Sequence, residues 1–221
     1  MALQYSITIN NRAASADTLM VFQNDPGSWS PNALSLAWFT KFSNPSPTAK
    51  VRFTWTLEVG LSWADTGVLA PGVDYVAAET YDPVAYNNYN EVTLDYNGAY
   101  LFKDFKPGPD PLPRLYLSET GNIPSASAAS VGVTMAGSTI YATQAKPNQK
   151  LTFSLKPSYF LAYGSFEEGQ VLNVSAINNP LQLTYPNGVY ALETTLNRDY
   201  SWTPPVSSAI ANAERMKLLS R

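Results

Sequence analysis

Apolar and polar side chains alternate through much of this chain, and the stretch VRFTWTLEVGLSW (residues 51–63) is a long run of that pattern. Its odd positions are all apolar: Val51, Phe53, Trp55, Leu57, Val59, Leu61 and Trp63. Successive side chains of a β-strand point to opposite faces, so this period of two predicts one strand with an apolar face. A strand this long is expected to bend, and Gly60 is the natural place. An exposed apolar row of this size is rare on a monomer, so we expect this face to lie in the core.

The same period recurs along the chain, in residues 3–9, 34–38, 131–135, 151–155, 181–185 and 190–196. Turn sequences rich in Gly and Pro, such as SNPSPT, KPGPDPLP and YPNG, separate these segments. The pattern predicts an all-β fold, a single antiparallel β-sandwich or jelly roll of roughly a dozen strands, in one domain over residues 1–203. Asn97-Gly98 predicts a two-residue hairpin turn, and that register would place Glu91 opposite Asp104.

Residues 204–221 form a tail of a different kind, because TPPV interrupts the alternation and SSAIANAERMKLLS is typical of a short helix. Ser207 or Ser208 could cap this helix at its N-terminus. A helix of about three turns is marginal alone, so we expect it to dock on its own domain or on a second copy. The candidate interface residues are Ile210, Ala213, Met216, Leu218 and Leu219.

The charge balance disfavours several partners. The formal net charge is −3, and the 14 Lys and Arg residues are scattered singly, so there is no basic field for nucleic acid. No run of eighteen apolar residues predicts a membrane span. The alternation that begins at Leu3 is typical of a strand and not of a signal peptide. We therefore expect a cytoplasmic protein, although export by a non-classical route would leave no mark in the sequence.

Cysteine and histidine are both absent, which excludes Ser-His-Asp and Cys-His catalysis as well as thiolate and imidazole metal sites. Paired carboxylates could still hydrolyse glycosides, and the acidic residues on predicted strands are Glu58, Glu79, Glu91 and Glu193. None belongs to a recognisable motif, and solvated carboxylates on outer strand faces explain them equally. The loops 82–91 and 166–169 lack the ligand spacing of a calcium site. We expect no catalysis and no cofactor.

The loop TYDPVAYNNYNE brings tyrosines and asparagines together in a short segment. Such residues on loops suit carbohydrate or protein recognition, since they combine rigid amphipathic area with adaptable hydrogen bonds. They are also normal anchors of a half-buried loop. The candidate ligand loop consists of Tyr81, Tyr86, Asn87, Asn88 and Tyr89.

The segment from Phe22 to Gly72 resembles the rhizosphere-induced protein family of rhizobia and other bacteria. The matching residues are Gln23-Asn24-Asp25-Pro26, Ser35-Leu36-Ala37-Trp38-Phe39, Phe53-Thr54-Trp55, Thr66-Gly67 and Pro71-Gly72. The later segments VGVTMAG, QAKPN, LTFSLKPSYFLAYG and YPNGVY are similar as well, so the resemblance extends to about Tyr190. It implies an abundant bacterial protein, produced under population-density control around plant roots, and it supplies no catalytic residues.

Three functions from different classes remain from these observations. The first is a non-enzymatic structural protein that assembles with itself into a homo-oligomer or filament, because low surface charge and many strand edges favour ordered association. The alternative is a lectin-like module that binds a carbohydrate or a host surface through the tyrosine loop. A jelly-roll glycosidase is a third, weaker reading.

Overall fold

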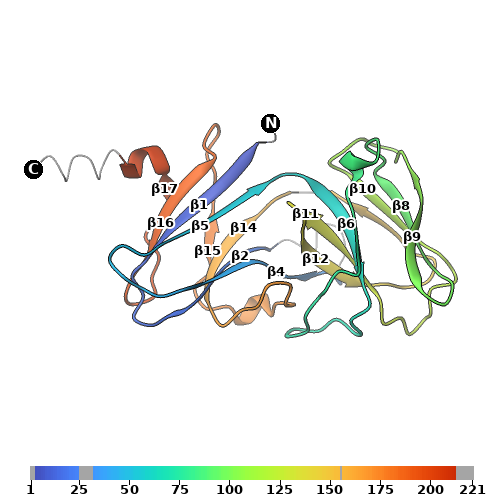
Figure 1. The fold of residues 1–221 in the computed structure, drawn as a ribbon, viewed down its shortest axis with the longest axis horizontal. Coiled ribbons are helices and arrows are strands. Elements are labelled where there is room, and N and C mark those ends of the chain that lie inside the picture. The colour runs from blue at the N-terminus through green and yellow to red at the C-terminus, as the bar shows by residue number, and fades with distance from the viewer. Residues whose placement is uncertain (1–2, 25–31, 155, 213–221) are drawn as a thin grey trace, which may run out of the picture.

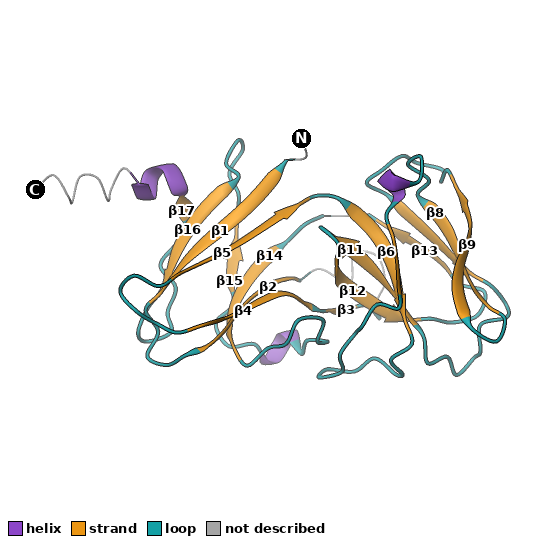
Figure 2. Cartoon of the chain, in the orientation of Figure 1, coloured by secondary structure: helices purple, strands orange, loops and turns teal. Residues whose placement is uncertain are grey.

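The computed structural model describes residues 3–24, 32–154 and 156–212, and strands make up most of the secondary structure (Figure 1, Figure 2). The first sheet has the order β17 (Val206–Ser207), β16 (Ala191–Leu196), β1 (Gln4–Asn11), β5 (Lys50–Thr56). The second has the order β15 (Leu181–Leu183), β14 (Tyr159–Gly164), β2 (Asp17–Gln23), β4 (Ala37–Ser43).

The third sheet has the order β3 (Leu34–Ser35), β12 (Ser138–Gln144), β11 (Ser130–Met135), β6 (Val59–Ala64), β7 (Glu79–Tyr81). The fourth has the order β13 (Lys150–Phe153), β10 (Leu115–Glu119), β8 (Glu91–Tyr96), β9 (Tyr100–Lys106). Two short 3-10 helices, η2 (Pro83–Ala85) and η3 (Val174–Ala176), lie in the connections. The first and fourth sheets occupy opposite ends of the long axis in Figure 1.

The predominantly β class predicted from the alternation is confirmed, but the single antiparallel sandwich is not. The described strands form four sheets, and two of their pairings, β1 with β16 and β8 with β10, are parallel. Parallel neighbours need a long crossover between them, and here the intervening chain supplies it. The local period of two does not indicate which distant strand becomes a neighbour, so it could not predict these parallel pairings.

The stretch 51–63 is two strands and not one. It breaks at Leu57 and Glu58, where the chain leaves the first sheet at β5 and enters the third at β6, the cyan ribbon that arches across Figure 1. Phe53, Trp55, Val59 and Leu61 are buried as predicted, whereas Leu57 at the break is 39% exposed. The bend expected at Gly60 therefore lies two residues earlier, and Gly60 itself is inside β6.

The hairpin at Asn97-Gly98 is confirmed, with a different register. The loop is three residues long, because Tyr96 pairs with Tyr100. A register shift follows on β9, where Asp104 adopts a positive φ of 55°. This bulge places Glu91 opposite Lys106, and the two form an ion pair at 3.1 Å. The three-residue loop and the bulge together replace the like-charge pair that a two-residue turn would have produced with an attractive pair.

One large hydrophobic cluster contains residues of all four sheets. At its centre Trp38 and Trp55 are fully buried, with ring centroids 5.5 Å apart and edge to face. Tyr159 packs on both indoles, at 6.1 Å from Trp38 and 5.0 Å from Trp55. The Nε1 of Trp38 donates to the backbone oxygen of Met135 at 3.1 Å. The aromatic row of the sequence is thus core, as predicted.

The tail begins as the sequence predicts, since residues 208–212 are helical and the Ile210 amide donates to Ser207 Oγ at 3.3 Å. Ile210 is 53% exposed. The other candidate interface residues, namely Ala213, Met216, Leu218 and Leu219, lie outside the described residues. In the part of the chain that is described, no helix has the length and apolarity needed to cross a membrane.

Glu119, at the end of β10, is a carboxyl group that sequence analysis did not single out. Its side chain is 4% exposed, and Oε2 accepts a hydrogen bond from the Lys146 amide at 3.1 Å. Oε1 accepts none from any described residue. Burial raises the pKa of this carboxyl to about 7, because desolvation disfavours the charged form.

We predict that Glu119 makes the protein less stable as pH rises. The unfolded chain releases this proton near its ordinary pKa of 4.5 and the folded chain only near 7, so stability is lost between these values. Glu119→Gln should therefore gain up to ~3 kcal/mol relative to the wild type on going from pH 4 to pH 8. Urea unfolding at both pH values measures this difference. Glu167→Gln, which removes an exposed carboxylate, controls for net charge, and a Glu119→Gln effect independent of pH would contradict the prediction.

Candidate functional site

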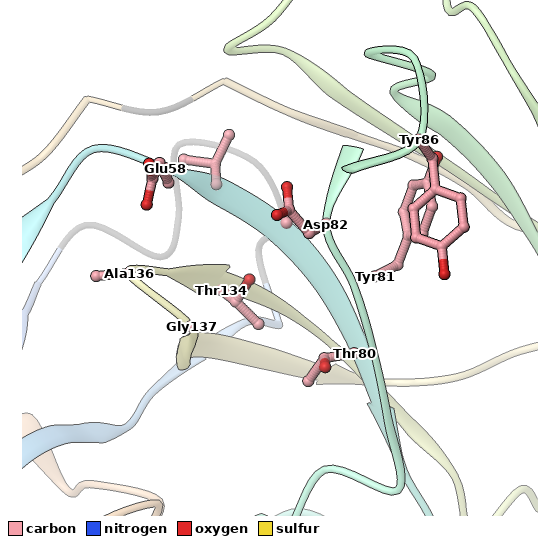
Figure 3. A pocket seen from close by; sticks show the side chains of 10 residues that line it. Glu58, Thr80, Tyr81, Asp82, Tyr86, Thr134, Ala136 and Gly137 are labelled. Atoms are coloured by element: carbon pink, nitrogen blue, oxygen red, sulfur yellow. The ribbon is translucent and has the colours of Figure 1, made fainter. Parts of the chain in front are cut away.

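A pocket of about 420 Å³ lies beside β7 and next to the tyrosine loop, and we call it the β7 pocket (Figure 3). Strands β6, β7 and β11 and the turn between β11 and β12 build it. Its lining residues are Glu58, Val59, Gly60, Thr80, Tyr81, Asp82, Tyr86, Thr134, Ala136 and Gly137. Elements far apart in the sequence thus meet around one concave surface.

Gly60 sets how closely these elements approach. A Cβ atom at this position would lie 2.3 Å from the Tyr81 backbone oxygen and 2.8 Å from Thr134 Oγ1. No larger residue fits without moving β7 or the Thr134 side chain. The turn beside it is fixed as well, because the Ala136 amide donates to the Glu58 backbone oxygen at 2.8 Å.

Hydrogen-bond acceptors make up one half of the pocket. Figure 3 shows the Asp82 side chain above Thr134 and Glu58 at the opposite side of the pocket, above Ala136. Asp82 is held in place because its Oδ1 accepts the Val84 amide at 2.9 Å as the N-cap of η2. Glu58 Oε2 accepts from Thr56 Oγ1 at 2.9 Å. Two carboxylates and two threonine hydroxyls can therefore receive or share the hydroxyl protons of a polar ligand.

Aromatic rings make up the other half, on the far side of β7. Successive residues of a strand point to opposite faces, and in Figure 3 the Tyr81 ring leaves β7 away from Asp82 and lies against Tyr86. Phe105 from β9 completes the group, 4.7 Å from Tyr81 and 6.0 Å from Tyr86 between ring centroids. Tyr81 is buried, whereas Tyr86 is 55% exposed and Phe105 is 37% exposed. Tyr86 and Phe105 stack with their planes 13° from parallel, and both rings keep surface exposed to solvent.

The five residues of the predicted ligand loop have different positions. Tyr81 and Tyr86 line the pocket, and Asn87, Asn88 and Tyr89 do not. The asparagines have positive φ angles of 55° and 59° and form the turn after η2. The Tyr89 backbone oxygen accepts the Tyr81 hydroxyl at 2.6 Å, which fixes the buried ring. Burial raises the pKa of that Tyr81 hydroxyl to about 12, so it stays a donor.

Asp82 and Phe105 line or flank this site although sequence analysis did not single them out. Asp82 precedes Pro83, a pattern typical of a cap, and this signal was readable. Phe105 reaches the site through the register of the hairpin, and nothing in the sequence predicted that register. The other acidic candidates are engaged elsewhere: Glu79 accepts Trp63 Nε1 at 2.7 Å, Glu91 pairs with Lys106, and Glu193 accepts Asn10 Nδ2 at 2.9 Å.

Acidic side chains do not gather into a metal centre in the described ranges. Among residues 3–24, 32–154 and 156–212, no three of them are close enough to hold a metal ion together. The β7 pocket contributes two carboxylates, Glu58 and Asp82. Its chemistry is therefore that of acceptor groups beside an aromatic surface.

We predict that Gly60→Ala displaces β7 and lowers the free energy of unfolding by about 1–3 kcal/mol, the usual cost of overpacking. Urea unfolding measures this loss. Gly121→Ala is the matched control, because its Cβ would meet the end of the Asn148 side chain at 3.0 Å, which can move away. Equal stability of the two variants would mean that β7 can shift freely.

Comparison with known proteins shows to which family this chain belongs. The family model RhiA matches residues 2–206. Protein RhiA of Rhizobium leguminosarum bv. viciae is 33% identical over 201 residues, which are 90% of this chain and 85% of that protein. No solved structure matches. The match covers all four sheets and both halves of the β7 pocket, and the resemblance seen in the sequence is confirmed: this chain belongs to the RhiA family.

Proposed function

We propose that this protein is a non-enzymatic carbohydrate-binding protein, and that the β7 pocket is its binding site. The observation that carries the proposal is that the exposed rings of Tyr86 and Phe105 lie on one side of β7 and the acceptor groups of Asp82 and Glu58 on the other. Binding sites for small polar molecules combine apolar walls with a few placed polar groups, and this pocket has both.

The division of the pocket by β7 suits a chain of sugars better than a single one. A sugar ring has an apolar face of C–H groups, which can lie on the Tyr86 ring. Its hydroxyls are donors, and Asp82, Glu58, Thr80 and Thr134 supply acceptors on the other side of the strand. An oligosaccharide can engage the aromatic rings with one unit and the acceptors with the next.

A binding role without hydrolysis is supported by how the carboxylates are used. Glycoside hydrolysis needs one carboxyl group as acid and a second as base or nucleophile across the bond. Asp82 uses an oxygen to cap η2, and Glu58 is an exposed side chain bonded to Thr56. We propose that Glu58 and Asp82 hold hydroxyls and do not transfer protons to a leaving group.

The family resemblance suggests which ligands to try first. The resemblance implies a role around plant roots, so we propose that neutral polysaccharides of plant and bacterial surfaces are tried before other glycans. The cytoplasmic location predicted from the sequence stays a prediction. Immunoblots of culture medium and cell fractions decide whether surface polysaccharides are within reach of this protein.

We predict that Tyr86→Ala weakens binding to an immobilised glycan array about tenfold, since it removes roughly 1.4 kcal/mol of ring contact. Asp82→Asn should weaken binding while keeping the helix cap, because asparagine caps as well as aspartate. Dissociation constants for the best glycan of the array measure both effects.

Tyr190→Ala is the matched control for Tyr86→Ala, because Tyr190 is 39% exposed and does not line the β7 pocket. Circular dichroism checks that each variant is folded. Binding that survives both Tyr86→Ala and Asp82→Asn would reject this pocket, and release of reducing sugar from the bound glycan would reject the non-enzymatic role.

A second proposal is self-assembly through the tail, and one observation favours it. Ile210 is 53% exposed on the helical residues 208–212, which project beyond β17 at the left of Figure 1. An apolar side chain on a short helix outside its own core is suited to a second copy of the chain. We propose that these residues dock in trans and form a homo-oligomer.

We predict that deletion of residues 208–221 leaves a folded protein of lower oligomeric order, because this deletion retains β17. Light scattering across a concentration series measures the mass of both forms. Ile210→Asp should act in the same direction with no loss of chain length. A truncated protein that assembles at the same concentration as the wild type would exclude the tail as the connector.

A further inference from the structure

A second pocket, of about 330 Å³, lies at the other end of the molecule, and we call it the Tyr200 pocket. It is lined by Asp17, Tyr163, Asn178, Asn179, Tyr200 and Trp202, among others. These residues come from the start of β2, the end of β14, the segment after η3 and the connection between β16 and β17. Figure 1 places that connection at the left of the molecule and η2 at the right.

The aromatic side chains of the Tyr200 pocket are held by hydrogen bonds. The Tyr163 hydroxyl donates to the Ser15 backbone oxygen, and the Tyr200 hydroxyl lies 3.0 Å from Ser15 Oγ. Trp202 Nε1 donates to the Asn179 backbone oxygen at 3.0 Å. Asn179 Nδ2 donates in turn to the Tyr200 backbone oxygen at 3.0 Å. The site is therefore formed before any ligand arrives, which lowers the entropy cost of binding.

Tyr200 adopts a left-handed backbone conformation, with φ +62°. The conformation closes a tight turn, in which the Tyr200 amide donates to the Asn197 oxygen at 3.0 Å and the Asn197 amide to the Ser201 oxygen at 2.8 Å. Glycine or asparagine would close it with less strain than a bulky residue. The geometry of the turn therefore does not account for a tyrosine at position 200, whereas a role for its ring would.

The Tyr200 ring is suited to contact a ligand. It stacks on Tyr163 with centroids 5.9 Å apart and planes 26° from parallel, yet it remains 43% exposed. One face of the Tyr200 ring is therefore covered by Tyr163, and another part of the same ring is exposed to solvent. Beside it, Asn178 makes no hydrogen bond to any described residue, so its amide has both donors and an acceptor to offer.

The charge of the lining residues limits which ligands the Tyr200 pocket can bind. Asp17 is the one charged side chain among the described lining residues of the Tyr200 pocket. Its Oδ1 accepts the Thr18 amide at 2.9 Å, which leaves Oδ2 for a ligand hydroxyl. Asp17 forms no ion pair with any described residue, so its carboxylate repels uronates and other acidic sugars and accepts hydrogen bonds from neutral ones.

We propose that the Tyr200 pocket is a second carbohydrate site, selective for a neutral pyranose, with Tyr200 as the stacking platform and Asp17 and Asn178 as hydroxyl partners. It stands on its own residues and does not depend on the β7 pocket. Where both sites bind, one chain is bivalent and links two glycans.

A quaternary ammonium ion is the rival ligand, because aromatic rings and a carboxylate also bind cations. A cation cage needs rings that face one another around an open space. Tyr163 and Tyr200 instead stack on each other, which leaves no room between them. The geometry favours the flat face of a sugar, and choline serves as the test of the rival.

Trp202 provides a local signal for the experiment, since its indole N–H lies in the Tyr200 pocket and the β7 pocket contains no tryptophan. The full-length protein, labelled with ¹⁵N, is titrated with glucose, galactose and mannose oligosaccharides, glucuronate and choline. We expect a neutral oligosaccharide to shift the Trp202 indole resonance, and glucuronate to bind more weakly. Tyr200→Asn, which suits the left-handed turn, should weaken this binding about tenfold. Asp17→Asn, which preserves the contact to Thr18, should weaken it and reduce the discrimination against glucuronate.

Tyr86→Ala is the matched variant of the other site and should leave the Trp202 shift unchanged. The proposal is overturned if no neutral oligosaccharide moves the Trp202 resonance, if Tyr200→Asn binds as well as the wild type, or if choline or glucuronate binds in preference. If Tyr86→Ala binds glycan as well as the wild type while Tyr200→Asn does not, the β7 pocket is rejected and this site stands. The reverse result rejects this site and leaves the β7 pocket. Cross-linking of glycan-coated beads by monomeric protein, lost in either single variant, supports bivalence.

Discussion

The packing of Trp38, Trp55 and Tyr159 is the contact on which the rest of the structure depends. Trp38 comes from β4, Trp55 from β5 and Tyr159 from β14, and the Trp38 indole also donates to the backbone of β11 at Met135. Three sheets therefore meet at one group of rings. Large aromatic side chains bury much area and prefer edge-to-face or offset contacts. They therefore set the distance between the sheets and contribute strongly to the stability of the core. The arch from β5 to β6 keeps its course because Trp55 is held at one end of it and Gly60 is closely packed at the other.

Local features of the fold were predictable from the sequence, because alternation and turn residues act over a few positions. The core face of Phe53 and Trp55, the hairpin at Asn97-Gly98 and the Ser207 cap all follow from nearest neighbours. Strand β2 was missed because its apolar residues run without a break, and from Leu19 to Phe22 all are buried. A strand buried on both faces loses the alternation that identifies it. The four-sheet arrangement was out of reach for a different reason, since partner choice between distant strands is a property of the whole chain.

The candidate sites show the same division. Tyr81 and Tyr86 stand out in the sequence because they are close together in one loop. The groups that complete their site come from elsewhere: Glu58 lies at the strand break, which the pattern placed at Gly60, and Phe105 depends on a bulge at Asp104. Sequence analysis did not identify the Tyr200 pocket, because its residues are spread along the chain from Asp17 to Trp202. Residues that act together without being neighbours in sequence become visible only when the fold is known.

The pairing of β1 with β16 has a consequence for how the protein is made. The register from Ser6 with Ala191 to Asn11 with Leu196 joins the first strand to nearly the last. During synthesis β1 leaves the ribosome early and can pair with β5, but its other edge stays open until residues 191–196 are translated. At about 5–20 residues per second this interval is on the order of ten seconds or more. For that time every nascent chain carries an unpaired strand edge, and polysomes bring many such edges close together. During that interval the open edge of β1 is a site at which one nascent chain can pair with another.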